Sequence, residues 1–175
     1  NQLSGGGCEH MGNFPTFPVK GKLKMSPDNI LNYRINISEE KGHAGYYEAM
    51  VQEDIKAKLT VTERTGMASY EYPADQQYGT IIIGGGISAT PIEQAAIVIT
   101  APNKCEGYAE GGNFCGLRTP YKVYFVAEFD TDALETGTWK REELMPNTTF
   151  AEGEYSGVYF TFDVNKKKNI QYKIG

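Results

Sequence analysis

Strict alternation of apolar and polar residues is the feature that most limits how this sequence can fold. The stretch IKAKLTVT at 55–62 places its apolar side chains at odd positions and its lysines and threonines at even positions. The stretch YKVYFVAEF at 121–129 again places apolar or aromatic side chains at every odd position. Because successive side chains of a strand point to opposite faces, this period of two predicts strands buried on one face and exposed on the other.

Further segments of strand character follow one another at short intervals. The sequence predicts additional strands at 33–37, 46–51, 68–72, 80–83, 96–100, 157–164 and 170–174. The segment at 80–83 is apolar throughout, which indicates cover on both faces, and the glycines at 84–86 are expected to end it. Polar residues 165–169 are expected to turn a hairpin between the last two strands.

The predicted fold class is all-β, an antiparallel β-sandwich. The only helices expected are short ones near 132–134 or around 91–94. Repeated short strands without recurring helices favour two packed sheets. A length of 175 residues with 40% hydrophobic residues fits one domain with its own core.

Charge and hydropathy exclude several classes of protein. The net charge is −5 and no long basic block occurs, so a nucleic-acid partner is not expected. No apolar run of about 18 residues is present, so the sequence predicts no membrane span. The chain begins Asn1-Gln2 without an initiator methionine or signal peptide, and we expect it to have been cut from a longer polypeptide.

The three cysteines, Cys8, Cys105 and Cys115, leave two interpretations open. Either one disulfide and one free thiol are present, or all three are buried free thiols. A zinc site would require Cys8, His10 and a distant ligand to converge, which the spacing does not favour. No metal ligand is assigned.

The N-terminal stretch 3–18 is rich in glycine. Pro15 and Pro18 exclude a regular helix or a central strand there. The stretch is either a solvent loop or a loop that packs on a neighbouring surface through Leu3, Phe14 and Phe17. The residues alone do not decide between these two.

Four groups of segments together carry a resemblance to a known family. They are 2–8 with 12–18, 45–48 with 55–66 and 70–73, 112–116 with 121–129, and 157–163. In this order, over almost the whole chain, they resemble the N-terminal domain of glycoside hydrolase family 92, the calcium-dependent exo-acting α-mannosidases, here of the alpha-1,2-mannosidase type.

The resemblance implies a β-sandwich of the supersandwich type, which in the family packs on a helical barrel with the active site between them. Residues 1–175 would form a single sandwich domain, trimmed at both ends, from the N-terminal part of a two-domain enzyme whose catalytic barrel is absent. It also implies a bacterial protein that is periplasmic, secreted or on the cell surface.

The resemblance also guides the search for chemistry. An inverting glycosidase needs two carboxyl groups about 6.5–9.5 Å apart, and among 22 acidic residues pairs such as Glu128 and Asp130 arise by chance. In the family, the catalytic acid, the base and the calcium ligands belong to the barrel. We therefore assign no catalytic residue, expect no cofactor in this chain, and expect calcium in the catalytic domain of the parent enzyme.

Family loops at the domain interface contribute to the mannose pocket, and Phe114, Cys115 and Gly116 match that segment. An aromatic face suits a sugar ring and glycine lets backbone groups approach hydroxyls, although Phe114 and Cys115 equally suit core or interdomain packing. Ser4 and Gly5 lie in a second candidate loop with the same alternative. The single tryptophan, Trp139, is either a sugar platform or a partly buried structural residue.

Three functions are compatible with these observations. The first is the N-terminal domain of an α-mannosidase that acts on mannose-containing glycans, with its own C-terminal catalytic domain as partner and no activity alone. The second is an autonomous carbohydrate-binding module or lectin-like sandwich. The third is a purely structural or adhesive sandwich.

Overall fold

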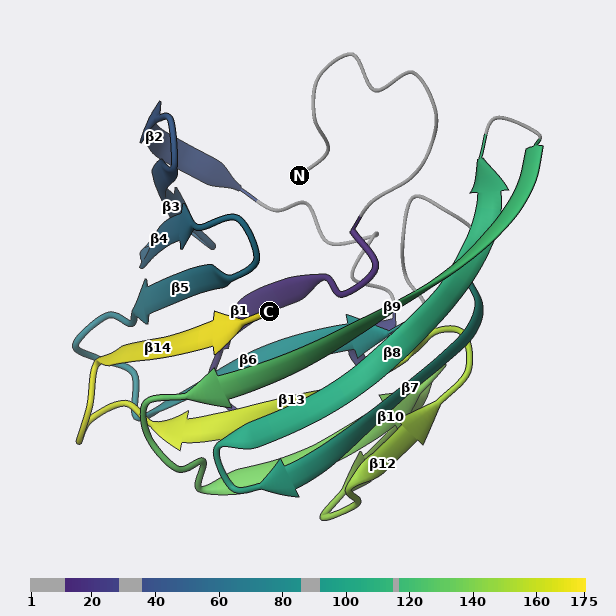
Figure 1. Ribbon diagram of the computed structural model, residues 1–175. Helices are drawn as coiled ribbons and strands as arrows, with labels where there is room; N and C mark the ends of the chain where they lie inside the picture. Colours follow the sequence, from purple (N-terminus) through teal and green to yellow (C-terminus); the bar gives the residue numbers. More distant parts are fainter. Residues whose placement is uncertain (1–11, 29–35, 86–91, 115–116) are drawn as a thin grey trace.

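The computed structural model of the chain describes residues 12–28, 36–85, 92–114 and 117–175. In this part of the chain the regular structure is almost entirely strand, and two antiparallel sheets face each other (Figure 1). The predicted antiparallel β-sandwich is confirmed. The described residues include no helix that is long and apolar enough to span a lipid bilayer.

The smaller sheet has five strands in the order β1-β6-β13-β10-β11. Their bounds are β1 Thr16–Lys20, β6 Tyr78–Gly85, β13 Ser156–Asp163, β10 Glu135–Lys140 and β11 Glu143–Pro146. Because β1 is an edge strand, Pro18 is accommodated without breaking the ladder.

The larger sheet has nine strands in the order β12-β7-β8-β9-β14-β5-β4-β3-β2. Their bounds are β12 Phe150–Glu152, β7 Ile92–Ala101, β8 Lys104–Phe114, β9 Leu117–Phe129, β14 Asn169–Ile174, β5 Gly66–Glu71, β4 Ile55–Val61, β3 Tyr46–Val51 and β2 Ile37–His43. The long β8–β9 hairpin rises above the rest of the sandwich in Figure 1.

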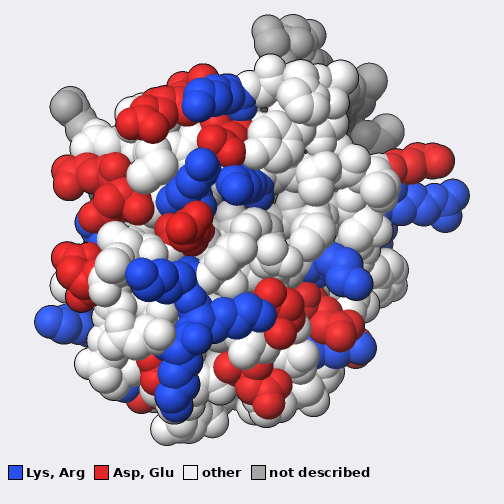
Figure 2. Space-filling view, turned by 90° about the vertical axis from the view of Figure 1, so that its left-hand side faces the viewer, with Lys and Arg blue, Asp and Glu red and all other residues white. Residues whose placement is uncertain are grey.

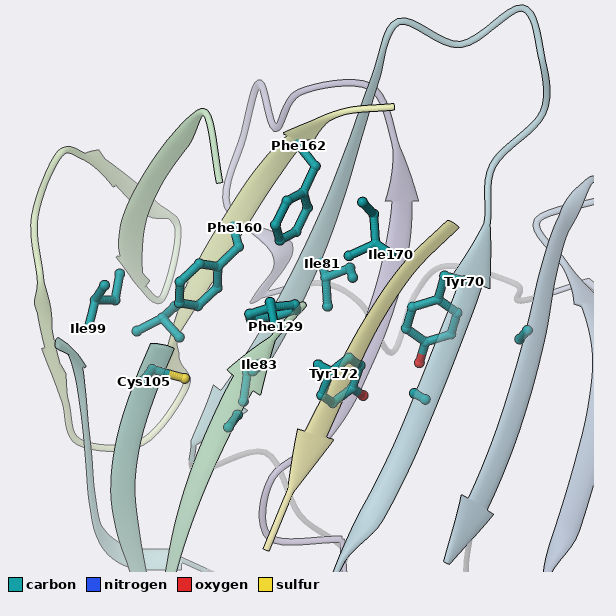
Figure 3. Close-up of a cluster of buried hydrophobic side chains, with 14 of the residues drawn as sticks. Tyr70, Ile81, Ile83, Ile99, Cys105, Phe129, Phe160, Phe162, Ile170 and Tyr172 are labelled. Carbon is teal, nitrogen blue, oxygen red and sulfur yellow. The ribbon is translucent and has the colours of Figure 1, made fainter. Parts of the chain in front are cut away.

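The main core lies between the two sheets and is rich in aromatic residues (Figure 3). The ring of Phe129 in β9 is 4.7 Å from that of Phe160 and 5.1 Å from that of Phe162, both in β13, and 5.2 Å from that of Tyr172 in β14. Such tilted aromatic contacts add to the burial of apolar area that holds the sheets together.

A second core covers the outer face of the smaller sheet. Ile82, Trp139 and Tyr159 are buried there, with Leu23 from the segment after β1 packed against them. Ser26, farther along that segment, donates a hydrogen bond from Oγ to the carbonyl oxygen of Arg141. The apolar run at 80–83 is therefore covered on both faces, as predicted.

Several sequence predictions need correction. Gly84 and Gly85 do not end their strand: they continue β6 and pair with Gly157 and Ser156. Pro15 lies 3.1 Å from a Cβ built on Gly84, and Ile97 lies 3.1 Å from a Cβ built on Gly85. These two side chains occupy the space that the glycines leave free. The short helices are also wrong, because β7 begins at Ile92 and residues 132–134 are not helical.

The predicted hairpin between the last two strands is wrong as well. β13 pairs with β6 and β10 in one sheet, whereas β14 pairs with β5 and β9 in the other. The turn between them crosses the sandwich, and the Nζ atom of Lys167 lies 2.7 Å from Oδ2 of Asp130. A polar turn fixes where the chain reverses but not which sheet receives it. Of the strand predicted at 33–37, residues 33–35 lie outside the described residues.

Candidate functional site

Most residues predicted to line a sugar pocket fall outside the part of the chain that the structure describes. Those outside it are Ser4, Gly5, Cys115 and Gly116. Phe114 is the last residue of β8, and its backbone pairs with Leu117 of β9. The side chain of Phe114 is outside the described part.

The described residues that flank these two segments meet at one end of the sandwich. Asn13 donates a hydrogen bond from Nδ2 to the hydroxyl oxygen of Tyr121 over 2.8 Å, between residues 108 positions apart. The ring of Phe14 lies 4.2 Å from that of Phe125. The end of the N-terminal stretch is thus attached to the β9 strand of the β8–β9 hairpin by one polar and one aromatic contact.

Phe14 also anchors this attachment in a small apolar cluster beside the middle of the hairpin. The buried members of the cluster are Ile92, Ala95 and Ala109, and Val123 packs against them. Phe17 in turn packs on the second core at the outer face of the smaller sheet. The described part of the N-terminal stretch therefore packs on the sandwich, as in the second of the two interpretations that the sequence left open.

A β-bulge at Gly112 sets the direction of the hairpin beyond this attachment. The pairing of β8 with β9 shifts between Gly111 and Asn113, and Gly112 has a φ of +157°. A Cβ on Gly112 would lie 2.5 Å from Cα of Pro120 and 2.6 Å from the carbonyl oxygen of Thr119. Only glycine fits this close backbone approach, and bulges of this kind commonly re-aim a strand near functional sites.

Charged side chains in the half of the hairpin nearer its turn occur in pairs. Nζ of Lys122 lies 2.5 Å from Oε1 of Glu110 and 3.7 Å from the centre of the Tyr108 ring. The hydrogen bond with Glu110 raises the pKa of the Lys122 ammonium above its ordinary value. Arg118 lies 3.6 Å from Glu93 across the exposed surface.

The acidic pair noted in the sequence has structural contacts. Asp130 accepts a hydrogen bond from the backbone N–H of Gln171 in addition to its ion pair with Lys167. Glu128 lies opposite Lys104 on one neighbouring strand and Lys173 on the other. Both carboxylates lie beside lysines or backbone donors in the larger sheet.

The described residues do not fit a calcium site. Calcium takes roughly six to eight oxygen ligands. Within residues 12–28, 36–85, 92–114 and 117–175, no group of three or more His, Cys, Asp or Glu residues is placed to hold a metal ion. We derive no step through calcium in this part of the chain.

Trp139 is not a sugar platform. It lies on the outer face of the smaller sheet with only 1% of its surface exposed, packed with Ile82 and Tyr159. Its indole N–H has no hydrogen-bond partner. The tryptophan is therefore structural and more deeply buried than the sequence suggested, because the segment after β1 covers this face.

Cys105 is a free thiol buried in the main core. Burial, with a smaller contribution from Glu106, raises its pKa to about 12. Because the thiolate is the reactive form, this cysteine is chemically inert at neutral pH. Cys8 and Cys115, and with them the question of pairing, lie outside the described residues, as does His10.

Sequence reasoning missed three residues that shape this end of the molecule: Asn13, Gly112 and Tyr121. All three belong to segments that carried the family resemblance, but the pairing of Asn13 with Tyr121 has no local signal. Gly112 gave a weak signal, since a glycine inside a strand pattern indicates a bulge or a close backbone approach.

Comparison with known proteins assigns the fold. Among similar solved structures, the family GH92 α-mannosidase BT3965 from Bacteroides thetaiotaomicron has a TM-score of 0.82 and 23% identity, covering 100% of this chain and 25% of that chain. The GH92 inverting mannosidase BT2199 from Bacteroides thetaiotaomicron VPI-5482 has a TM-score of 0.75 and 21% identity. The match covers 93% of this chain and 21% of that chain. The GH92 glycosyl hydrolase ccman5 has a TM-score of 0.80 and 20% identity. The match covers 98% of this chain and 24% of that chain.

At these identities the structural likeness shows a shared fold alone, and the chain spans a quarter or less of the length of each of these proteins. No curated protein sequence matches the chain. The sequence does match the family described as "Glycosyl hydrolase family 92 N-terminal domain" over residues 1–175. With sequence and fold in agreement, the chain belongs to the N-terminal domain family of glycosyl hydrolase family 92.

Proposed function

We propose that this chain is the non-catalytic N-terminal domain of a glycosidase that acts on mannose-containing glycans, and that one end of its sandwich lines the sugar site. Family membership supports a glycoside hydrolase domain. The similar structures of BT3965 and BT2199 are described as an α-mannosidase and an inverting mannosidase. An α-1,2-linked mannoside is the first substrate to test.

The observation that carries this proposal is the attachment of Asn13 and Phe14 to Tyr121 and Phe125. It joins the segment that precedes β1 to the β9 strand of the β8–β9 hairpin. Both segments predicted to contact sugar are continuous with these anchors in sequence. Loops that are fixed by packing and hydrogen bonds hold a ligand more precisely than free loops, because less conformational entropy is lost on binding.

Catalysis in this proposal belongs to a second, C-terminal domain of the same polypeptide. An inverting glycosidase needs one carboxylic acid to protonate the leaving oxygen and one carboxylate to activate water. We propose that the second domain supplies both groups and binds calcium, while the sandwich positions the glycan. The proposal includes a periplasmic, secreted or cell-surface location in a bacterium.

The proposal is tested with the full-length polypeptide that carries this chain, using an aryl α-mannoside and α-1,2-mannobiose. The full-length protein should hydrolyse both, and chelation of calcium should abolish turnover. Glu106→Gln and Glu128→Gln should leave kcat within about twofold of the parent value, since neither carboxylate takes part in the chemistry. Absence of mannosidase activity, or loss of kcat in either variant, would contradict the proposal.

A self-contained carbohydrate-binding module is the second candidate. It is favoured by aromatic side chains exposed on the larger sheet, Tyr124 and Phe150 among them. Titration calorimetry of the 175-residue chain with mannose and manno-oligosaccharides separates the two candidates. A module binds sugar with a measurable constant on its own, whereas half of a composite site does not.

A further inference from the structure

A pocket lies between the edge strand β1 and the segment at 21–28 that follows it. Its volume is about 300 Å³, at the lower end of the range for small-molecule sites. None of its described lining residues belongs to β8 or β9, so the pocket is separate from the candidate sugar site. It is called the edge pocket below.

The floor of the edge pocket is apolar. Phe17 of β1 is paired with Ile82 of β6, and Val19, two positions farther along β1, faces the same side of the sheet. Leu23 packs against the buried cluster that contains Ile82. Phe17, Val19 and Leu23 are each only partly buried, so they present apolar surface inside a concavity, which is what the apolar body of a ligand requires.

The segment that forms one wall of the edge pocket is held near both of its ends. At its start, the backbone N–H of Gly21 donates to the carbonyl oxygen of Tyr78 over 2.8 Å. Oγ1 of Thr80 donates to the carbonyl oxygen of Gly21 over 2.7 Å. Farther along, Ser26 donates from Oγ to the carbonyl oxygen of Arg141. A pocket that is held in shape before a ligand arrives loses less conformational entropy on binding.

The polar side chains that line the edge pocket leave mainly hydrogen-bond donors free. They belong to three lysines, Ser26 and Gln52, and no Asp or Glu is among the described lining residues. Oε1 of Gln52 already accepts the backbone N–H of Lys20 over 3.3 Å. Oγ of Ser26 already accepts the backbone N–H of Asp28 over 3.2 Å. This composition favours a ligand whose polar end accepts hydrogen bonds and carries negative charge.

Of the three lysines, Lys24 is the one left for a ligand. Nζ of Lys20 lies 2.9 Å from Oδ1 of Asp54. Lys22 is paired with Glu135. Within the described residues Lys24 has no ion-pair partner, and it is an exposed lining residue, which places it at the opening of the pocket. One uncompensated positive charge beside an apolar floor matches a ligand with one negative charge and an apolar body.

The distribution of charge argues against a large anionic partner. Figure 2 views the side of the molecule that carries β2 to β5 and shows basic side chains interspersed with acidic ones. The chain as a whole has a net charge of −5. A nucleic acid or an anionic membrane surface needs an extended basic face. The ligand that suits this pocket is therefore a small molecule with a single negative charge.

We propose that the edge pocket binds a free medium-chain monocarboxylate. The carboxylate pairs with the Lys24 ammonium group, and the hydrocarbon chain lies on Phe17, Val19 and Leu23. At about 30 Å³ for each water-sized group, the pocket holds roughly ten non-hydrogen atoms, which is the size of octanoate. The site does not depend on the proposed mannoside site and shares no residue with it.

Titration calorimetry of the full-length polypeptide with octanoate tests the proposal, with octan-1-ol and acetate as matched ligands. Octanoate should bind at least about tenfold more tightly than either, because octan-1-ol lacks the charge and acetate lacks the chain. Equal binding of octanoate and octan-1-ol would show that the charge is not recognised and would overturn the proposal. A protein that binds octanoate as expected but hydrolyses no mannoside would contradict the proposed function alone.

A pair of matched substitutions identifies the lysine. Lys24→Gln and Lys168→Gln each remove the charge of an exposed lysine that has no ion-pair partner among the described residues. Lys168 lies in the turn between β13 and β14, outside the lining of the edge pocket. Lys24→Gln should weaken octanoate binding about three- to tenfold, whereas Lys168→Gln should leave it unchanged. Equal effects of the two substitutions would contradict the assignment.

A photoreactive analogue of octanoate, with a diazirine on its chain, locates the site within the full-length polypeptide. Mass spectrometry should find the label on β1 and on the segment at 21–28, and a label confined to other parts of the polypeptide would overturn the proposal. Vesicles of anionic phospholipid provide the last arm. If they sediment the protein and octanoate competes with them, the pocket belongs to a membrane surface, and the proposal of a free carboxylate is wrong.

Discussion

The indole ring of Trp139 lies across Gly157 on the neighbouring strand. A Cβ atom placed on Gly157 would lie 2.3 Å from Cη2 of Trp139. Two register positions along, the arrangement is reversed, and Tyr159 covers Gly137 with its hydroxyl 2.5 Å from a Cβ built there. Aromatic rings on β10 and β13 thus fill the space that glycine leaves on the opposite strand.

Gly157→Ala should therefore destabilise the domain strongly. The added methyl group would meet both the Trp139 ring and the carbonyl oxygen of Ile83, which is backbone and cannot move aside. We expect a loss near the upper end of the about 1–3 kcal/mol typical of overpacking, measured by urea unfolding. Gly42→Ala is the control, because its nearest contacts at 3.4 and 3.6 Å leave room for a methyl group. Equal losses in the two variants would refute this account.

Trp139 should behave as a buried reporter and not as a ligand contact. The protein has a single tryptophan, which is 1% exposed. Its fluorescence should resist quenching by iodide and should not change when mannose is added. Strong quenching, or a sugar-dependent shift in emission, would restore the interpretation of Trp139 as a sugar platform.

The contact between Asn13 and Tyr121 should affect substrate binding in the full-length enzyme. Asn13→Ala and Tyr121→Phe each remove one partner of this exposed hydrogen bond. We expect each to raise KM about two- to fivefold with little change in kcat, corresponding to about 0.5–1 kcal/mol. The double variant should be no worse than either single variant.

Tyr46→Phe is the matched control for that experiment. The hydroxyl of Tyr46 donates to Glu48 over 2.7 Å within β3 of the larger sheet. Its removal should leave KM unchanged. Additive effects of Asn13→Ala and Tyr121→Phe, or an equal effect of Tyr46→Phe, would show that the attachment does not position the sugar site.

Gly112→Ala should disturb the hairpin more than the core. The new Cβ would clash with backbone atoms of Thr119 and Pro120, so the bulge must rearrange. We expect KM for a mannoside to rise in the full-length enzyme while near-UV circular dichroism of the core remains native. In Gly66→Ala, where a Cβ lies 3.4 Å from Cγ2 and 3.8 Å from the carbonyl oxygen of Ile174, both ordinary contact distances, KM should not change. A native KM in Gly112→Ala would separate the bulge from substrate binding.

The stability of the domain should fall in alkaline solution through Cys105. Burial raises its pKa from 9.0 to about 12, so between these values the unfolded chain releases a proton that the folded chain keeps. The free energy of unfolding is unaffected below pH 9 and decreases as the pH rises above it, by up to about 4 kcal/mol across the full window. Tyr72 and Tyr172, whose pKa values burial raises well above 10.0, act in the same direction at higher pH.

Urea unfolding of the parent and Cys105→Ala at about pH 8 and pH 10 isolates the contribution of the thiol. The variant should be less stable at the lower pH, because alanine leaves a cavity in the main core. It should lose less stability than the parent between the two pH values. A parallel decline in both proteins would attribute the alkaline loss to other groups.

The sequence predicted the strands and their faces most accurately where alternation is strict. In β9, Phe125 and Ala127 point into the core while Tyr124 and Val126 point outward, as the period of two at 121–129 predicted. It predicted poorly where glycine interrupts the pattern. Gly84 remains in β6 because Pro15, far away in sequence, packs over it.

In the candidate site, too, the sequence predicted some features and not others. Its segments were found through the family resemblance, but the pairing of Asn13 with Tyr121 joins residues 108 positions apart. No property of either segment alone specifies that contact. The residues predicted to touch sugar, Ser4, Gly5 and Phe114 to Gly116, remain predictions.

By itself, the sequence determined that this protein is built from antiparallel strands and which side chains of the regular strands face inward. It could do so because alternation is a local property that each strand carries in its own residues. Only the tertiary structure decided that β13 and β14 lie in opposite sheets, that Trp139 is enclosed, and that Asn13 contacts Tyr121. Those features depend on contacts between distant residues, whose energies are settled by packing of the whole sandwich rather than by any single strand.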